Sequence, residues 1–226
     1  MKWFVDPTRF RYPEEYRKQI ETVHQSRPDV WDRIMSDPTY TEDEFWENIF
    51  TNRTNDLVPI SNLLVVPIKI TEPVSELKQM LSDSLKVDPD IFNYLRSIRS
   101  SGLQLGILSN HSRYWMSIFV NKYGLVPTFD SEMIINSQDV ACRKPDPKIY
   151  EILINRVNAH ISTDITPSQI IFIGISLPIQ FNLKTDDKPA NVDAAQKMGL
   201  KSFVFNRKIH EPSQFATSLA TFGINL

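Results

Sequence analysis

Three polar segments of this 226-residue sequence carry side chains that together could bind an anion and a metal ion. Ser109 and Asn110 follow an apolar run, where a hydroxyl group and the backbone N–H groups of a helix start are suited to hold an anion. Lys144 lies just before a proline, and a residue in that position is kept extended, so its ammonium group can be aimed at a ligand. Asp186 and Asp187 precede an expected helix, and adjacent carboxylates suit a hard cation such as Mg²⁺.

Each segment taken alone also has an ordinary structural explanation. Serine and asparagine after a strand are common helix N-caps. A single lysine is usually solvated on the surface, and paired aspartates often lie at an exposed helix N-terminus. The order and spacing of the three segments are therefore more informative than any one of them.

Together, the three segments resemble motifs II, III and IV of the haloacid dehalogenase-like (HAD) superfamily. The likeness rests on Ser-Asn after a strand at residues 109–110, on Arg-Lys-Pro-Asp-Pro-Lys-Ile-Tyr at residues 143–150, and on Asp-Asp-Lys-Pro-Ala-Asn-Val-Asp-Ala-Ala at residues 186–195, with Gly199 closing the helix. It covers about residues 88–206. The sequence most resembles the branch of small phosphatases and dehalogenases that carry a helical cap after the first strand.

This resemblance implies a role for each residue in phosphoryl transfer. Ser109, Asn110 and Lys144 would bind the phosphorylated substrate, with Ser109 donating a hydrogen bond to a phosphoryl oxygen and Lys144 neutralising charge. Asp186 and Asp187 would hold Mg²⁺. Phosphoryl transfer depends mainly on positioning and on positive charge near the equatorial oxygens, which a lysine, a metal ion and N–H donors can supply. The expected partner is a small phosphorylated molecule.

The first family motif, an aspartate nucleophile at the end of the first strand, is not intact in this sequence. The closest candidate is Asp6, after the apolar residues 3–5, and the resemblance implies that it would serve as the nucleophile and as a third Mg²⁺ ligand. Pro7 removes one backbone N–H donor from this segment. Thr8 stands where the family has an acid or a glycine, and Arg9 replaces a flexible glycine.

A second departure lies between the strand expected at residues 170–173 and Asp186, where the family runs directly from the strand to the acidic pair. Residues 174–185 intervene here, a stretch of 12 residues. A surface loop of this length can return to the strand end at modest entropic cost; otherwise the acidic pair is displaced from it. Both departures would also follow from an imperfect gene model with a missing first exon and a retained short intron.

The elements that would position these residues are those of a doubly wound α/β fold. From about residue 88 onward, helical segments with cap signals alternate with short apolar runs, which is typical of parallel strands and covering helices in a Rossmann-like (HAD) core. Helices are expected to start at Asp88, Asp146 and Asn191, and a further helix is expected to carry Trp115, Ile118 and Phe119 on its apolar side. The expected strands are residues 103–108, 133–135, 170–173 and 202–205.

The segment ahead of this region shows helical patterns without convincing strands and is interpreted as a separate cap. The expected division is a core of residues 1–9 and 88–226 and a helical cap of residues 10–87. Helices are expected in the cap at residues 16–24, 30–35 and 45–50, and Thr41 with Glu44 forms a capping-box signature. Large aromatic residues at helical spacing usually fill a core. The expected core of the cap is therefore Trp31, Phe45 and Trp46.

Composition and charge narrow the function classes. The formal net charge is −2 and the pI is about 6.1, so the chain has no broad positive field that would favour nucleic acid or an anionic membrane as a partner. The one cysteine, Cys142, excludes an intramolecular disulfide and favours a reducing compartment. The N-terminal residues lack a signal-peptide core, and no apolar run approaches the ~20 residues of a spanning helix. A soluble, cytoplasmic protein is expected, of no particular oligomeric state.

The leading hypothesis is a Mg²⁺-dependent phosphatase of a small phosphorylated metabolite that works through an aspartyl-phosphate at Asp6. The alternative, prompted by the broken first motif, is a catalytically impaired HAD-like protein that serves as a binding or regulatory module. Dehalogenation of small organic acids is a third possibility, which the acidic pair disfavours because dehalogenases need no metal. His111 is expected to be solvated or packed, and Cys142 to be buried, rather than catalytic.

Overall fold

The computed structural model describes residues 4–5, 28–50, 75, 78–79, 82, 85–161, 164–176, 189–206 and 210–224. Within these residues, helices alternate with parallel strands, which confirms the expected α/β, Rossmann-like core. None of the helices in these ranges is long and apolar enough to cross a membrane. The helix expected at residues 16–24 lies outside the described residues.

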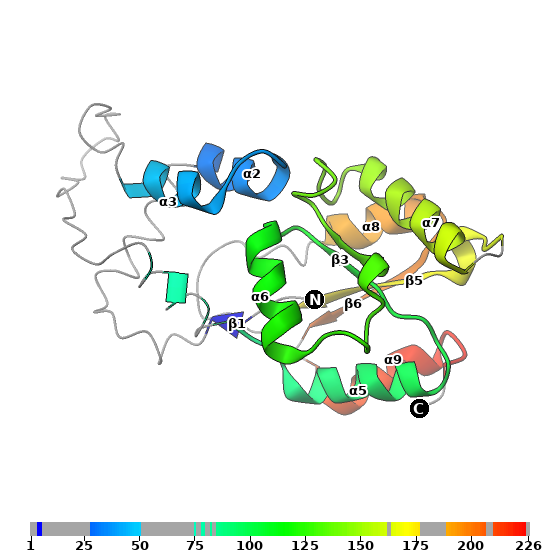
Figure 1. Ribbon diagram of the computed structural model, residues 1–226. Coiled ribbons are helices and arrows are strands. Elements are labelled where there is room, and N and C mark those ends of the chain that lie inside the picture. The colour runs from blue at the N-terminus through cyan, green and yellow to red at the C-terminus, as the bar shows by residue number, and fades with distance from the viewer. Residues whose placement is uncertain are drawn as a thin grey trace, which may run out of the picture.

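The core contains two pairs of parallel strands (Figure 1). β3 (Ile107–Ser109) pairs with β4 (Ile134–Asn136), and β5 (Ile171–Ser176) pairs with β6 (Lys201–Asn206). Each strand is matched to its partner residue by residue along its whole length. Because the strands of a pair run in the same direction, their carboxyl ends meet at one edge.

A third ladder is short and antiparallel. It is formed by β1 (Phe4–Val5) and β2 (Leu85–Lys86), in which Phe4 lies opposite Lys86 and Val5 opposite Leu85. Phe4 and Val5, ahead of Asp6, are therefore paired with the strand that leads into α5, and not with a strand of the parallel pairs.

Helices cover both faces of the parallel strands (Figure 1). α5 (Pro89–Ser100) and α9 (Pro212–Ala220) share a buried cluster on one face, and α7 (Pro147–Ile161) and α8 (Pro189–Lys197) share another on the opposite face. α6 (Arg113–Tyr123) follows β3 and contributes to the first cluster. The C-terminal helix α9 was not among the expected elements.

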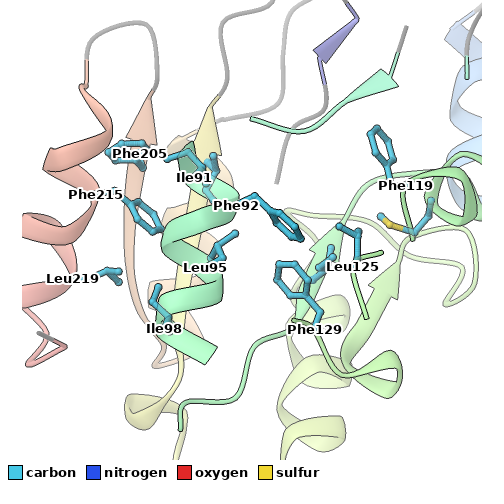
Figure 2. Close-up of a cluster of buried hydrophobic side chains, with 13 residues drawn as sticks. Ile91, Phe92, Leu95, Ile98, Phe119, Leu125, Phe129, Phe205, Phe215 and Leu219 are labelled. Atoms are coloured by element: carbon cyan, nitrogen blue, oxygen red, sulfur yellow. The ribbon is translucent and has the colours of Figure 1, made fainter. Parts of the chain in front are cut away.

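Side chains of the strands alternate between the two buried clusters. Ile107 packs with residues of α5 and α9, whereas its neighbour Leu108 packs with residues of α7 and α8. Ile175 and Phe172 of β5 divide between the clusters in the same way. Successive residues of a strand point to opposite faces, so the two parallel pairs lie side by side between the same helical layers. Figure 2 shows the first of these clusters, with α5 and α9 against the strands.

α5 starts and ends where the sequence predicts. The side chain of Asp88 accepts hydrogen bonds from the backbone N–H groups of Asp90 and Ile91, which caps the first turn. Gly102 follows the helix with a φ of 90°, a conformation that glycine adopts without a steric cost. The buried residues recur at helical spacing and face the first cluster: Ile91, Phe92, Leu95 and Ile98.

The strands differ from the expected ones in their bounds. The run of residues 103–108 becomes a strand only at Ile107, and Leu103 is exposed before it. Gly106 is needed there, because a Cβ at this position would lie 2.9 Å from the carbonyl oxygen of Met133. β5 extends to Ser176, so the first three residues of the loop expected at 174–185 belong to the strand.

α2 (Pro28–Ser36) and α3 (Glu42–Phe50) form a helical unit ahead of the core. The predicted capping box at the start of α3 is confirmed. The N–H of Glu44 donates to Thr41 Oγ1 (3.2 Å), and the N–H of Thr41 donates to Glu44 Oε2 (2.7 Å). These bonds satisfy two N–H groups that a helix start leaves without partners.

The aromatic cluster of the helical unit includes Trp115, which belongs to α6 of the α/β core. Phe45 and Trp46 are buried as expected, and the ring of Trp31 packs edge-on against Phe45 at 5.0 Å between centroids. Trp115 of α6 joins them, with its ring centroid 5.4 Å from that of Phe45 and 5.8 Å from that of Trp31. The unit therefore buries its apolar face against α6 and not only within itself.

Glu42, the first residue of α3, is a buried carboxylate at the contact with α6. Its Oε1 accepts hydrogen bonds from the indole N–H groups of Trp46 and Trp115, each at 3.2 Å. Lys78 forms an ion pair with its Oε2 at 3.2 Å. Burial raises the pKa of Glu42, although the indole N–H groups and Lys78 favour the charged form. This carboxylate therefore links the helical unit to α6.

Replacing Glu42 by alanine should lower the free energy of unfolding by about 2–4 kcal/mol, because two buried indole N–H donors lose their acceptor. Glu42→Gln keeps an acceptor oxygen, so its free energy of unfolding should fall by less than half as much. Urea titration followed by tryptophan fluorescence measures both changes. Equal losses in the two variants would contradict this account of the carboxylate.

Candidate active site

A reciprocal pair of hydrogen bonds joins the end of β3 to the segment ahead of α7. Asn110 Nδ2 donates to the backbone carbonyl of Lys144, and the N–H of Lys144 donates to Asn110 Oδ1, both at 2.9 Å. The side-chain amide thus satisfies both backbone groups of the lysine. It holds together two residues that are 34 positions apart in the sequence.

The ammonium group of Lys144 lies at the edge of β3 that faces away from β4. Its Nζ donates to the carbonyl of Leu108 at 2.6 Å. The carbonyl of Ser109 accepts from the N–H of Ser137 on the β4 side, and successive carbonyls of a strand point to opposite edges, so the Leu108 carbonyl faces away from β4. Lys144 Nζ also lies 5.5 Å from the centre of the Phe172 ring in β5. The positive charge therefore lies between the two pairs of parallel strands.

The structure places half of the predicted site residues next to one another at the carboxyl end of β3: Ser109, Asn110 and Lys144. Ser109 is the last residue of the strand and is buried. The predicted metal ligands lie outside the described residues: Asp6, Asp186 and Asp187. Among the residues that are described, no three His, Cys, Asp or Glu side chains are grouped so that they could hold a metal ion.

The described chain resumes two residues after Asp187, at the start of α8. The hydroxyl of Tyr150 in α7 donates to the carbonyl of Asn191 in the first turn of α8, at 2.7 Å. Gly174 lets α8 approach β5 closely, because a Cβ there would lie 3.0 Å from Cγ2 of Val192. The start of α8 is therefore held against α7 and β5.

The helical unit α2–α3 lies against the loops that carry these residues. Arg143, next to Lys144, forms an ion pair with Asp32 of α2 at 2.5 Å. Ser137 and Gln138, which follow β4, are buried and bond both to the loop after β3 and to the helical unit. Sequence reasoning missed these two residues, because two polar residues after a strand carry no pattern that distinguishes them from a surface turn.

Two further side chains near the site are packed, as expected. His111 lies edge-on to the rings of Trp115 and Phe119, and its Nδ1 is buried without a hydrogen-bond partner in the described part of the chain. Burial lowers the pKa of His111 to about 4, so its imidazole is neutral at pH 7. Cys142 is buried, and burial raises the pKa of its thiol, which disfavours the reactive thiolate.

The sequence matches a known family over most of its length. Residues 38–205 match the family of haloacid dehalogenase-like hydrolases. This chain belongs to that family. The matched region contains Ser109, Lys144 and Asp187 and begins after Asp6.

Solved structures of HAD proteins share the fold. A predicted HAD-like family hydrolase from Porphyromonas gingivalis is 17% identical, with a TM-score of 0.60 over 92% of this chain and 89% of its own. A HAD family enzyme from Bacteroides thetaiotaomicron in complex with magnesium is also 17% identical, with a TM-score of 0.58 over 94% of this chain and 92% of its own. A mutant of that enzyme with magnesium and inorganic phosphate is 15% identical, with a TM-score of 0.55 over 88% and 86% of the two chains.

Asn110→Ala should lower the free energy of unfolding by about 1–3 kcal/mol, because the N–H and carbonyl groups of Lys144 lose their partners. Asn158→Ala is a matched control at the other end of α7, where Asn158 Oδ1 accepts one bond from the Ile165 N–H at 3.0 Å. Urea unfolding measures both variants. A loss no larger than that of the control would show that the reciprocal pair adds little.

His111 should make the folded state less stable as the pH falls from about 6.5 to about 4. In this range the unfolded chain binds a proton at the imidazole and the folded chain does not, so folding becomes less favourable by an amount on the order of 3 kcal/mol. His111→Phe keeps an aromatic ring and removes the titration. Urea unfolding between pH 4 and pH 7 should therefore show a flatter profile for the variant, and an identical profile would rule out a neutral, buried imidazole.

Proposed function

We propose that this hydrolase is a Mg²⁺-dependent phosphatase that acts on a small phosphorylated metabolite. The observation that carries the proposal is the position of the Lys144 ammonium group, 2.6 Å from the Leu108 carbonyl and beside Ser109. Ligands of open α/β sheets bind beyond the carboxyl ends of the strands. A cation and a hydroxyl group at that edge suit a phosphoryl group, whose negative charge is spread over its oxygens in the transition state.

In the proposed reaction, a carboxylate oxygen of Asp6 attacks phosphorus, the ester bond to the leaving oxygen breaks, and an aspartyl-phosphate forms. Ser109 would donate a hydrogen bond to a phosphoryl oxygen, and Lys144 would neutralise charge on the phosphoryl group and the nucleophile. Water then hydrolyses the acyl phosphate, which releases phosphate and restores Asp6. Thr8 has no acidic proton to give to a leaving alkoxide, so esters with acidic leaving groups should react best.

Three carboxylates would hold the metal ion in this proposal: Asp6, Asp186 and Asp187. Carboxylate oxygens suit Mg²⁺, which also retains several waters. The start of α8 lies two residues after Asp187 and packs against α7 and β5. This supports a position for the acidic pair near β5. When bound, Mg²⁺ would stabilise negative charge on the phosphoryl oxygens. One Bacteroides thetaiotaomicron structure contains magnesium and the other contains magnesium and inorganic phosphate, which supports the choice of ion and ligand class.

The helical cap proposed for residues 10–87 would exclude water from the site and select the substrate, and residues 1–9 and 88–226 would form the core. The ion pair between Arg143 and Asp32 supports this, because it lies one residue from Lys144. A reducing compartment such as the cytoplasm suits the buried free thiol of Cys142.

A second candidate function is a binding or regulatory module that keeps the fold and the anion site without turnover. Two observations favour it. The family match begins at residue 38, after Asp6. The strand ahead of Asp6, β1, pairs antiparallel with β2 and not with the parallel strands that carry Ser109. Such a module would bind a phosphorylated ligand through Ser109 and Lys144.

Hydrolysis of p-nitrophenyl phosphate with Mg²⁺ tests the phosphatase, because this ester needs no proton on its leaving group. Asp6→Asn and Lys144→Ala should each lower kcat/KM about 100-fold or more, since they remove the nucleophile and the charge beside the phosphoryl group. Lys148→Ala removes an exposed lysine four positions further along and should leave kcat/KM within about twofold. Chelation of the metal with EDTA should abolish turnover.

If the wild type hydrolyses none of a broad panel of phosphate esters, the phosphatase proposal is wrong. The binding module then predicts that inorganic phosphate raises the Tm of the wild type but not that of Lys144→Ala. Turnover that survives Asp6→Asn would assign the nucleophile to another residue.

A further inference from the structure

Two polar side chains that follow β4 are fully or almost fully buried: Ser137 is 0% exposed and Gln138 is 4% exposed. Both accept hydrogen bonds from residues 109–113, which run from the last residue of β3 to the first residue of α6 and are called the loop below. The N–H of His111 donates to Ser137 Oγ at 3.0 Å, and the N–H of Arg113 donates to Gln138 Oε1 at 2.7 Å. This loop begins at Ser109, so the two side chains hold the segment that leaves the candidate site.

The same two side chains donate hydrogen bonds to the backbone of the helical unit. Ser137 Oγ donates to the carbonyl of Met35 in α2, and Gln138 Nε2 donates to the carbonyls of Asp37 (3.1 Å) and Tyr40 (2.7 Å). The last carbonyls of a helix have no partner within the helix itself. Ser137 and Gln138 therefore give partners to carbonyls at the end of α2 and in the turn that follows it.

We propose that Ser137 and Gln138 are positioning residues, which couple the placement of the helical unit α2–α3 to the conformation of the loop at residues 109–113. Each side chain accepts from the loop and donates to the unit. If the unit shifted alone, a buried donor or acceptor would be left unpaired, and such a state is strongly disfavoured. The loop and the unit therefore move together.

The coupling deepens the proposed function, and its kinetic consequence rests on that function. Ser109 and Asn110 begin the coupled loop, and Asn110 in turn holds Lys144. A displaced loop would misplace the groups that stabilise the transition state, and small misplacements lower turnover strongly. Loss of the coupling should therefore lower kcat more than it changes KM.

Two substitutions at Gln138 separate the two halves of the bridge. Gln138→Glu keeps the oxygen that accepts from the Arg113 N–H but loses the donor to the helical unit, and Gln138→Leu loses both. Amide hydrogen exchange measures the loop directly and needs no activity. If the unit and the loop are coupled, the Arg113 amide should exchange about tenfold faster or more in both variants. An Arg113 amide that exchanges as slowly in Gln138→Glu as in the wild type would overturn the proposal.

Ser137→Ala gives a second test, and Ser137→Thr is its rescue because threonine keeps the hydroxyl. For p-nitrophenyl phosphate, kcat should fall about tenfold or more in Ser137→Ala and Gln138→Glu, with KM changed less than about threefold, and should recover to within about threefold in Ser137→Thr. Ser202→Ala is the matched control, since this buried serine donates to the Val192 carbonyl at 3.2 Å, away from the loop. It should leave kcat and the exchange of the Arg113 amide unchanged.

Equal losses of kcat in Ser137→Ala and Ser202→Ala would reduce the effect to general destabilisation and would overturn the positioning role. If the wild type has no phosphatase activity, only the kinetic test is lost. The exchange of the Arg113 amide would then still decide whether the loop and the helical unit are coupled.

Discussion

The reciprocal bonding between the Asn110 side chain and the Lys144 backbone is the interaction on which the rest of the site depends. A free lysine side chain has about 2 kcal/mol of rotamer entropy to lose before its charge is fixed in one place. Here the backbone of the lysine is fixed first, by an amide anchored at the end of a strand. From this fixed backbone, the ammonium group donates a hydrogen bond to the Leu108 carbonyl. The neighbouring Arg143 forms an ion pair with Asp32 of α2.

Polar groups are buried together at the carboxyl edge of β3 and β4, where a purely structural core would place apolar side chains. Ser109 and Asn136 end the two strands, Ser137 and Gln138 follow, and all four are buried. Burial of polar groups is tolerated only when they are hydrogen-bonded. The two apolar clusters on either side of the strands supply the stability, and the polar edge fixes geometry. Such local departure from core composition is typical of functional sites.

Local signals in the sequence predict the helices well and the strands less well. The carboxylate of Asp88 and the pair Thr41 and Glu44 act within their own turns, so the predicted caps appear as expected. Strand bounds depend on partners distant in the sequence. Among the described residues, positions 103–106 have no strand partner, and Gly174 belongs to β5 because it pairs with Val204 of β6.

The meeting of the Ser109–Asn110 segment with Lys144 could be predicted, but the contacts that hold it could not. The expected meeting of Ser109 with Lys144 follows from the order of strands in a parallel sheet. The roles of Ser137 and Gln138 depend on where α2 lies, and the shared aromatic core depends on Trp115 facing the helical unit. Each of these is a tertiary contact between segments far apart in the chain. The type of one residue does not indicate which distant segment that residue will contact.

The hydroxyl of Tyr150 that holds the Asn191 carbonyl has a consequence for how this protein can change during evolution. It secures α8 from the side of α7, while β5 is secured by its pairing with β6. The connection between β5 and α8 therefore begins and ends at points that other parts of the fold keep in place. Insertions or deletions in that connection would leave strand register and helix packing intact at little entropic cost. Length variation among relatives should concentrate there, next to the predicted acidic pair, where it would tune chemistry without rebuilding the core.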